Sequence, residues 1–361
     1  MKIEALFAYF PKMTVKRFRE GIATFGSPDA FFYATTNDLR KQLSWDEHLI
    51  DLFISWREDL DVQRITKILE QEKITVITQD DEAYPPLLKQ IYDPPFCLFV
   101  RGTLNLTNQY PLAVVGTRKC STYGTQITHE LVTGLAQHGL TIVSGLALGI
   151  DGIAHDATLQ AGGTTIAVLG SGINRHHVYP AVHKQLSERI IEKGGAVMSE
   201  YPPGSLPSKF TFPRRNRIIA GITLGTLVVE AADKSGALIT SSYALEHGRE
   251  IFAIPHPITS PTGTGPNKLL KDGAHMVTSA SDIIDVLNLH ELQTFTQNAA
   301  IIPDSPEEAA ILEHLSREPI HVDELAKQSS LTSREVNSTL TLMEMKGKVR
   351  NIGNMHYVVA R

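Results

Sequence analysis

The sequence of 361 residues contains two cysteines and no long apolar run. Cys97 and Cys120 are too few for a disulfide framework or a cysteine zinc site, which suits a reducing compartment. Glu4 comes early, and Pro11-Lys12 ends the first apolar run, so we expect no secretory signal. No later run is long enough to span a bilayer. The sequence therefore predicts a cytoplasmic protein without a membrane segment.

The signatures of several enzyme classes are also absent. Gly170-Ser171-Gly172 begins like a dinucleotide-binding loop, but Arg175 stands where the third glycine belongs. No Walker A sequence and no Gly-x-Ser-x-Gly elbow occurs, and His129-Glu130 lacks the second histidine of a zincin. Four further histidines, His155, His176, His177 and His183, have no spacing typical of a metal site. We therefore expect no catalytic centre, no metal and no cofactor.

Acidic residues are missing from residues 201–229, although the formal net charge of the chain is -5. The same stretch carries one lysine and three arginines, all within residues 209–217. Unopposed guanidinium groups next to Phe210 and Phe212 suit a polyanion with stackable bases. A basic turn in contact with solvent is the simpler alternative, but the missing acids and the aromatic rings favour an anion site. The pI near 6.3 means that any nucleic-acid contact must be local.

The basic stretch also has the pattern of a helix start. Pro213 fits a first helical turn, and Ile218-Ile219-Ala220 can pack into a core. The three arginines, Arg214, Arg215 and Arg217, are then expected near a helix N-terminus, where free backbone N–H groups favour an anion.

The length allows two or three domains, and the periodicity divides the chain into five parts. Residues 1–70 are expected to form a small helical module of the SAM or helix-hairpin-helix type, suited to packing or partner contact as much as to nucleic acid. Residues 71–110 are expected to form a connector that packs on the core. Residues 111–287 alternate strands and helices, which predicts a Rossmann-like α/β core with a doubly covered parallel sheet. Residues 288–305 form a polar linker, and residues 306–361 are expected to form a winged helix that contacts either DNA or protein.

The expected elements can be given by their ranges. Helices are predicted at residues 15–25, 126–137, 181–193, 238–247, 307–316, 322–329 and 333–346. Strands are predicted at residues 74–77, 97–100, 112–115, 141–144, 165–169, 196–199, 226–230, 250–254 and 274–277, with a terminal hairpin at residues 348–359.

Ligands of an open parallel sheet bind beyond the carboxyl ends of its strands. The predicted loops at that edge are rich in small residues, which let backbone N–H groups approach a phosphate: they are residues 116–118, 144–151, 170–172 and 233–237. Arg118 follows the first strand of the core, so we expect one crevice to hold Arg118 and residues 210–217. Lys184 is placed to reach it as well. Asp151 is expected to cap a helix, and Glu200 and Glu230 are expected to orient arginines.

These residues together resemble the DprA/Smf family of DNA-processing proteins. The resemblance rests on Val115–Arg118, Ser144–Asp151 with Ala154-His155, Gly170–Gly172 followed by Tyr179-Pro180, Ser199–Pro202, Phe212–Gly221, and Glu230-Ala231 with Ser235–Thr240. It implies a single-stranded-DNA-binding recombination mediator that loads the RecA recombinase onto incoming strands during natural transformation, acts as a homodimer and is not an enzyme. His183 and His256 stand where the family often has Asn and usually has Gly, respectively.

The predicted DNA-contact residues follow from the crevice and the resemblance together. They are Arg118, Gly145, Gly149, Gly170, Gly172, Lys184, Phe210, Phe212, Arg214, Arg215, Asn216, Arg217, Ser235 and Gly236.

Two other functions remain open from the sequence. A Rossmann-like nucleoside-monophosphate phosphoribohydrolase would use a strand-end glutamate such as Glu230, but residues 220–230 keep only part of the expected glycine-rich motif. A sequence-specific regulator would work through the winged helix, whose third helix is only weakly basic.

Overall fold

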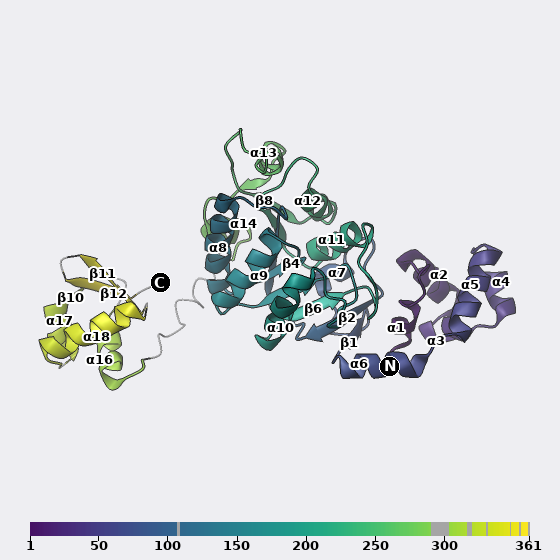
Figure 1. Ribbon diagram of the computed structural model, residues 1–361, viewed down its shortest axis with the longest axis horizontal. Coiled ribbons are helices and arrows are strands. Elements are labelled where there is room, and N and C mark those ends of the chain that lie inside the picture. Colours follow the sequence, from purple (N-terminus) through teal and green to yellow (C-terminus); the bar gives the residue numbers. More distant parts are fainter. Residues whose placement is uncertain are drawn as a thin grey trace. The chain divides into compact units, whose positions relative to one another are not determined.

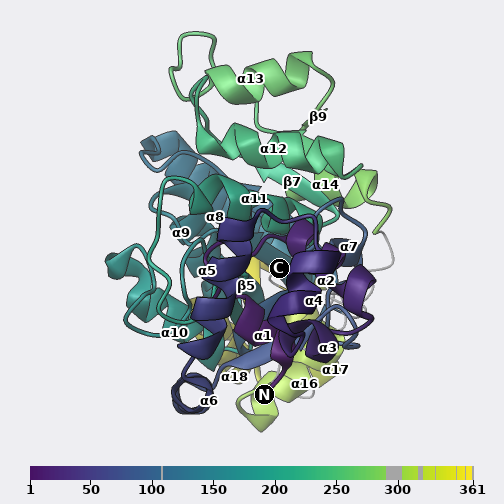
Figure 2. The same cartoon turned by 90° about the vertical axis from the view of Figure 1, so that its right-hand side faces the viewer.

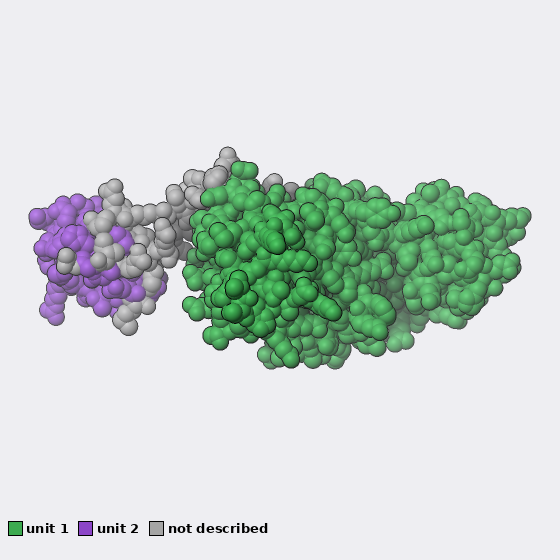
Figure 3. Space-filling model, turned by 90° about the horizontal axis from the view of Figure 1, so that it is seen from above, with its two compact units in different colours: residues 1–293 green, residues 294–361 purple. Residues whose placement is uncertain are grey.

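The computed structural model describes residues 1–106, 109–289, 303–315, 320–329, 331–346, 348–353 and 355–359. The chain forms two compact units, Met1–Gln293 and Thr294–Arg361 (Figure 3). Most of the predicted linker, at residues 290–302, lies outside the described residues. No helix in the described ranges combines the length and the apolar character needed to cross a membrane.

Residues 1–71 form short helices, as predicted for the N-terminal part. They are α1 (Ile3–Phe7), α2 (Val15–Phe25), α3 (Pro28–Phe32), α4 (Thr36–Gln42), α5 (Glu47–Glu58) and α6 (Val62–Gln71). The rings of Phe7, Phe31 and Phe53 stack at centroid distances of 4.8 to 6.0 Å and form the centre of this module. Phe18 stacks on Phe96 at 4.3 Å, so the module packs against the residues that lead into the sheet.

Nine strands of the first unit form one sheet in the order β1-β2-β6-β5-β4-β3-β7-β8-β9. Figure 1 labels β1, β2, β6, β4 and β8 of this sheet. They are β1 (Thr75–Thr78), β2 (Cys97–Gly102), β3 (Tyr110–Val115), β4 (Leu140–Ser144), β5 (Thr165–Val168), β6 (Ala196–Ser199), β7 (Gly225–Val228), β8 (Glu250–Ala253) and β9 (His275–Met276). The strands from β6 to β9 are parallel, whereas β1 and β2 pair antiparallel. Residues 71–110 were expected to form a connector that packs on the core. Their two strands instead join the sheet itself, a pairing that the sequence analysis did not predict.

Helices cover both faces of this sheet, which confirms the predicted doubly covered α/β core. On β3, Leu112 and Val114 contact one apolar cluster, whereas Ala113 and Val115 contact another. The first cluster includes α8 (Thr122–Gln137), α9 (Ile150–Gln160) and α14 (Ala280–Val286), and the second includes α7 (Pro86–Lys89), α11 (Thr211–Gly221) and α12 (Gly236–Glu246). The neighbouring pairs α8–α9 and α11–α12 are visible in Figures 1 and 2. The described residues of the core also form a short 3-10 turn (Ala181–His183), α10 (Lys184–Glu192) and α13 (Thr264–Lys271).

The second unit is a winged helix, as predicted. It contains α16 (Pro306–His314), α17 (Val322–Ser329) and α18 (Ser333–Met345), and an antiparallel sheet of β10 (Ile320–His321), β12 (His356–Val359) and β11 (Val349–Gly353). Ile311, Leu325, Val336 and Leu340 are fully buried in its core.

Two lysines of the winged helix are neutralised by two carboxylates. Lys346 and Lys348 both bond to Glu308, at 2.8 and 2.6 Å, and both also contact Asp304. The backbone N–H of Asp304 and the two lysines hold the pKa of Glu308 well below its usual range. These lysines therefore add little free positive charge for a DNA backbone.

This carboxylate–lysine network predicts acid sensitivity of the second unit. Because the folded-state pKa of Glu308 is lowered from 4.5 to about 2, its stabilising contribution is present above pH 4.5 and is lost as the pH falls toward 2. We expect Glu308→Gln to remove part of this pH dependence. Thermal unfolding of the whole chain, followed through the NMR methyl signals of Leu325 and Leu340, measures it. Parallel pH profiles for wild type and variant between these values would contradict the assignment.

Candidate functional site

A cleft of about 610 Å³ lies beyond the carboxyl ends of the central strands. We call it the strand-end cleft. Its walls come from the loop after β3, the loop after β4, the start of α11 and the start of α12. The lining residues are Val115, Gly116, Thr117, Arg118, Ala147, Asp151, Lys209, Phe212, Pro213, Arg215, Asn216, Ile219, Ser235, Gly236, Ala237, Ile239 and Thr240. The predicted crevice thus exists, and it brings together six of the predicted site residues: Arg118, Phe212, Arg215, Asn216, Ser235 and Gly236.

Two exposed cations border this cleft next to aromatic rings. The guanidinium carbon of Arg118 lies 5.4 Å from the ring centre of Phe212. The Nζ of Lys209 lies 5.1 Å from the ring centre of Phe210, a side chain that is 74% exposed. A solvent-facing cation beside an open ring can hold a phosphate and a base at once. Lys209 is not among the predicted contact residues, although its position three residues before Phe212 in the acid-free stretch could have made it a candidate.

Arg215 is buried and forms hydrogen bonds within the protein. Its guanidinium donates to the carbonyl oxygens of Gly145, at 2.7 Å, and of Val168, which lie at the ends of β4 and β5. Burial lowers the pKa of Arg215 to about 10, against the opposing effect of the nearby Asp151 carboxylate. Arg215 lines the strand-end cleft, but only 4% of the residue is exposed, so a DNA contact of Arg215 stays a prediction. Asn216 is held in the same way, with its amide donating to the carbonyl oxygen of Gly236 at 3.2 Å.

The prediction that Asp151 caps a helix is wrong, because its carboxylate binds the backbone of the loop after β4. The N-cap of α9 is Gly149, and no side chain caps this end. One carboxylate oxygen of Asp151 accepts from the backbone N–H groups of Gly145 and Ala147, at 3.1 and 3.4 Å. Desolvation raises the pKa of Asp151, and the nearby Arg215 acts in the opposite direction. The two buried groups together fix the floor of the cleft.

Arg217 is opposed by carboxylates, which corrects the expectation of unopposed guanidinium groups. It pairs with Glu200, and its Nε lies 3.6 Å from Asp93. Arg214 is half-buried, with its Nε 3.8 Å from Glu200. The prediction that Glu200 orients arginines is confirmed. Both opposing acids lie outside residues 201–229, so the composition of that stretch alone did not reveal them.

Four predicted phosphate-approach glycines make room for protein atoms. A Cβ at Gly145 would lie 2.5 Å from Nη2 of Arg215, and one at Gly170 would lie 3.0 Å from Cδ1 of Phe212. A Cβ at Gly172 would lie 2.8 Å from the carbonyl oxygen of Pro202, and Gly149, at a φ of +74°, packs against Thr117. Gly236 differs, because no atom would lie within 4 Å of its Cβ. Among these glycines, Gly236 has open space in front of it, at the start of α12 beside its N-cap Ser235.

Lys184 does not line the strand-end cleft. It is half-buried at the first residue of α10. The preceding His183 places its Nδ1 2.9 Å from the carbonyl oxygen of Leu146, which ties this segment to the loop after β4. A DNA contact of Lys184 stays a prediction.

Glu230 is fully buried and saturated with hydrogen bonds from other elements. It accepts from the backbone N–H and the hydroxyl of Ser121, at 2.8 and 2.6 Å, and from the hydroxyl of Thr262 at 2.9 Å. Nε2 of His256 lies 3.7 Å away, and Nδ1 of the same ring donates to the carbonyl oxygen of Ile254. The prediction that Glu230 orients an arginine is wrong. Its carboxylate joins the ends of β7 and β8 to the start of α8.

This arrangement predicts a stability cost for Glu230→Gln. The new amide keeps one acceptor oxygen and places an NH₂ group either against the N–H of Ser121 or against the donating hydroxyls of Ser121 and Thr262, so we expect a loss of about 1–3 kcal/mol in the free energy of unfolding. The exposed carboxylate Glu250 provides the control, because Glu250→Gln is expected to change it by less than about 0.5 kcal/mol. Urea denaturation measures both. Equal effects of the two variants would contradict the assigned role.

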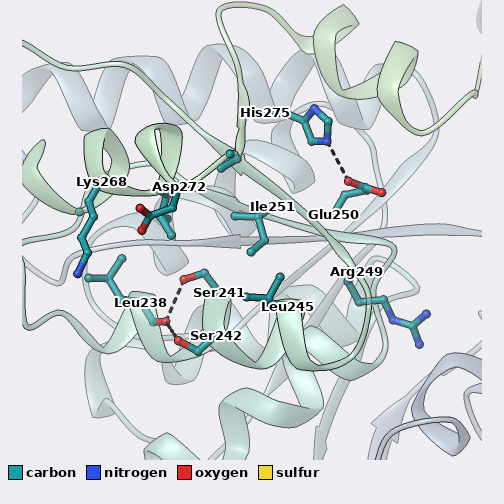
Figure 4. Close-up of a pocket in the computed structure, with 14 residues that line it drawn as sticks. Leu238, Ser241, Ser242, Leu245, Arg249, Glu250, Ile251, Lys268, Asp272 and His275 are labelled. Atoms are coloured by element: carbon teal, nitrogen blue, oxygen red, sulfur yellow. Dashed lines mark hydrogen bonds and ion pairs between the residues drawn. The ribbon is translucent and has the colours of Figure 1, made fainter.

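A second hollow of about 360 Å³ lies between α12, β8, α13 and β9 (Figure 4). Four of its polar side chains are paired locally: Glu250 bonds to His275 at 2.9 Å, and Ser241 and Ser242 donate to the carbonyl oxygen of Leu238. No Phe, Tyr or Trp occurs among the described residues that line it. The strand-end cleft is therefore the better candidate for a ligand with bases and phosphates.

Comparisons with known proteins agree with this organisation. Residues 75–288 match the family described as DNA recombination-mediator protein A, and residues 296–353 match the DprA winged helix domain. Protein Smf of Escherichia coli (strain K12) is 43% identical over 285 residues, which cover 77% of this chain and 76% of that protein. The DNA processing protein DprA of Bacillus subtilis (strain 168) is 41% identical over 231 residues, or 64% of this chain and 77% of that protein.

Two solved structures also resemble the chain. The X-ray structure of DNA processing protein A from Streptococcus pneumoniae has a TM-score of 0.69 at 36% identity, and the match covers 79% of this chain and 98% of that one. DNA processing protein A from Helicobacter pylori has a TM-score of 0.53 at 27% identity, with 60% and 96% covered, and its structure describes a single-stranded DNA binding mode.

Proposed function

Because this chain belongs to the DprA/Smf family of DNA-processing proteins, we propose that its strand-end cleft binds single-stranded DNA. The observation that carries the proposal is the pairing of exposed cations with rings at the cleft, Arg118 with Phe212 and Lys209 with Phe210. The single-stranded DNA binding described for the Helicobacter pylori relative supports it. The cations bind phosphates and the rings stack on bases, so binding is tolerant of sequence.

The recognition residues of this proposal form a smaller set than the sequence indicated. Arg118, Lys209, Phe210 and Phe212 contact the strand, and Gly236 at the start of α12 leaves room for it. Arg215, Asn216 and Arg217 hold the cleft in shape from the interior. Arg214, which is half-buried, contributes to the positive electrostatic potential near the cleft.

Salt dependence tests the cleft against a neutral binding surface. Each phosphate contact of a single strand contributes a slope of about -0.7 in log K against log salt, so the two cations predict about -1.4. Fluorescence anisotropy of labelled oligo-dT across a salt series, with unlabelled duplex as competitor, measures the slope and the preference. A salt-independent affinity, or displacement by equal amounts of duplex, would contradict the proposal.

We extend the proposal to recombination: the chain acts as a homodimer that loads RecA onto incoming single strands in DNA uptake, without catalysing a reaction itself. The description of its family as a recombination mediator supports this role. The test is RecA filament formation on single-stranded DNA with and without the protein, with sedimentation for the dimer.

We expect no free base from nucleoside monophosphates, because the Glu230 carboxylate is buried and hydrogen-bonded. Base release would favour the phosphoribohydrolase alternative.

A further inference from the structure

A small side hollow of about 30 Å³ adjoins the strand-end cleft. It shares Arg118, Ala147, Phe212 and Arg215 with the cleft, and Leu148 and Tyr179 are among its other lining residues. Arg118 and Phe212 thus form part of both linings. The hollow is too small for a base, so a base can enter it only if one of the exposed side chains around it moves.

Phe212 contacts two partners of different chemistry at this place. The guanidinium of Arg118 lies 5.4 Å from its ring centre, and the ring of Tyr179 lies 5.6 Å away at an interplanar angle of 45°. The tilt of the two rings is neither stacked nor edge-to-face, the two arrangements that aromatic pairs prefer. Tyr179 is 46% exposed and Leu148 is 44% exposed, and Arg118 is exposed as well. All three can therefore move without disrupting the buried core.

We propose that Tyr179 and Phe212 form a base slot, which Arg118 closes in the free protein and opens when it moves to a phosphate. Tyr179 is then a further DNA-contact residue. In this exchange the guanidinium of Arg118 leaves the ring of Phe212 and binds a phosphate. The ring of Phe212, no longer covered by the guanidinium, then stacks on a base. This inference rests on the proposed single-strand binding and adds to it a coupling between phosphate contact and base stacking.

The test compares two ligands of equal length, oligo-dT and an abasic strand with the same phosphates. Stacking of one base predicts that Tyr179→Ala weakens oligo-dT binding by about 5- to 150-fold. The same variant is expected to leave binding of the abasic strand within about twofold. Tyr179→Phe keeps the ring and is expected to retain oligo-dT affinity. Tyr179→Leu keeps the bulk of the side chain but has no ring, so it is expected to lose oligo-dT affinity to the same degree as Tyr179→Ala. It provides the test if the alanine variant folds poorly.

The matched control is Tyr92→Ala, because Tyr92 is 92% exposed and lies outside the linings of the cleft and the hollow. It is expected to change neither affinity. Equal losses on both strands in the Tyr179 variants would show a structural role and overturn the inference, as would unchanged oligo-dT binding. If the wild type binds neither strand, the proposed function fails together with the slot. If the wild type binds oligo-dT and the Tyr179 variants match it, the slot alone fails.

Discussion

Replacing Arg118 and Lys209 together with alanine is expected to weaken oligo-dT binding by about 30- to 300-fold without lowering the unfolding temperature. Each tenfold in affinity corresponds to about 1.4 kcal/mol, so this range is about 2–3.5 kcal/mol, or about 1–1.7 kcal/mol at each of two phosphates. That is near the lower end of the about 1.5–3 kcal/mol of a hydrogen bond to a charged group, as expected for contacts open to solvent. Both side chains are exposed and neither holds the fold, which is why stability is expected to stay unchanged. Fluorescence anisotropy and thermal unfolding measure the two quantities.

The control for this variant removes the same charge elsewhere. Lys67 and Lys193 are exposed lysines at α6 and at the end of α10, outside the strand-end cleft. The double variant Lys67→Ala/Lys193→Ala changes the net charge equally and is expected to weaken binding by less than about threefold. If both double variants lose affinity to the same degree, binding depends on overall charge and the cleft has no special role.

Arg215→Ala is expected to lower the free energy of unfolding by about 3–5 kcal/mol, the largest stability effect predicted for this chain. Removing the guanidinium leaves the carbonyl oxygens of Gly145 and Val168 without their donor and leaves Asp151 buried without an opposing charge. Urea denaturation at neutral pH measures the loss. Any loss of DNA binding in this variant follows from the altered cleft floor, because Arg215 has little surface to offer a strand.

The neighbouring arginine provides the contrast. Arg214 is half-buried, and its closest carboxylate oxygen, on Glu200, is 3.8 Å away. Arg214→Ala is therefore expected to cost less than about 1 kcal/mol, in the range of an exposed ion pair. A similar stability loss in both variants would contradict the division of the arginines into a buried and a peripheral class.

Local patterns predicted the elements of the core well because burial selects their residues. The parallel strands lie between two helical layers, so they appear in the sequence as short runs of Val, Ile, Leu and Ala. The predicted strand at residues 196–199 coincides with β6, and Thr165–Val168 ends one residue before its predicted limit. The connector was harder, because nothing in Thr75–Thr78 or Cys97–Gly102 specifies an antiparallel pairing with strands far along the chain.

The position of the cleft could be predicted from the sequence. Which of its residues are exposed and which are bound to other protein groups could not. Small residues after the parallel strands and the acid-free stretch identified the correct edge of the sheet. The sequence could not show that Arg217 meets Asp93, because more than a hundred residues separate them and only the fold joins them. It also could not show that Gly145 is small to admit Arg215, since a glycine-containing loop after a strand has the same pattern in sequence whether it receives a phosphate or a distant guanidinium.

The most direct test of the central claim is to find where a bound strand touches the protein. Oligo-dT carrying 5-iodouracil in place of thymine crosslinks on irradiation to side chains that stack on its bases, and peptide mass spectrometry locates the adducts. The account predicts adducts at Phe210, Phe212 and Tyr179, and fewer of them in the Arg118→Ala/Lys209→Ala variant. Adducts confined to residues 1–71 or to the winged helix would contradict it, because the strand would then bind away from the strand-end cleft.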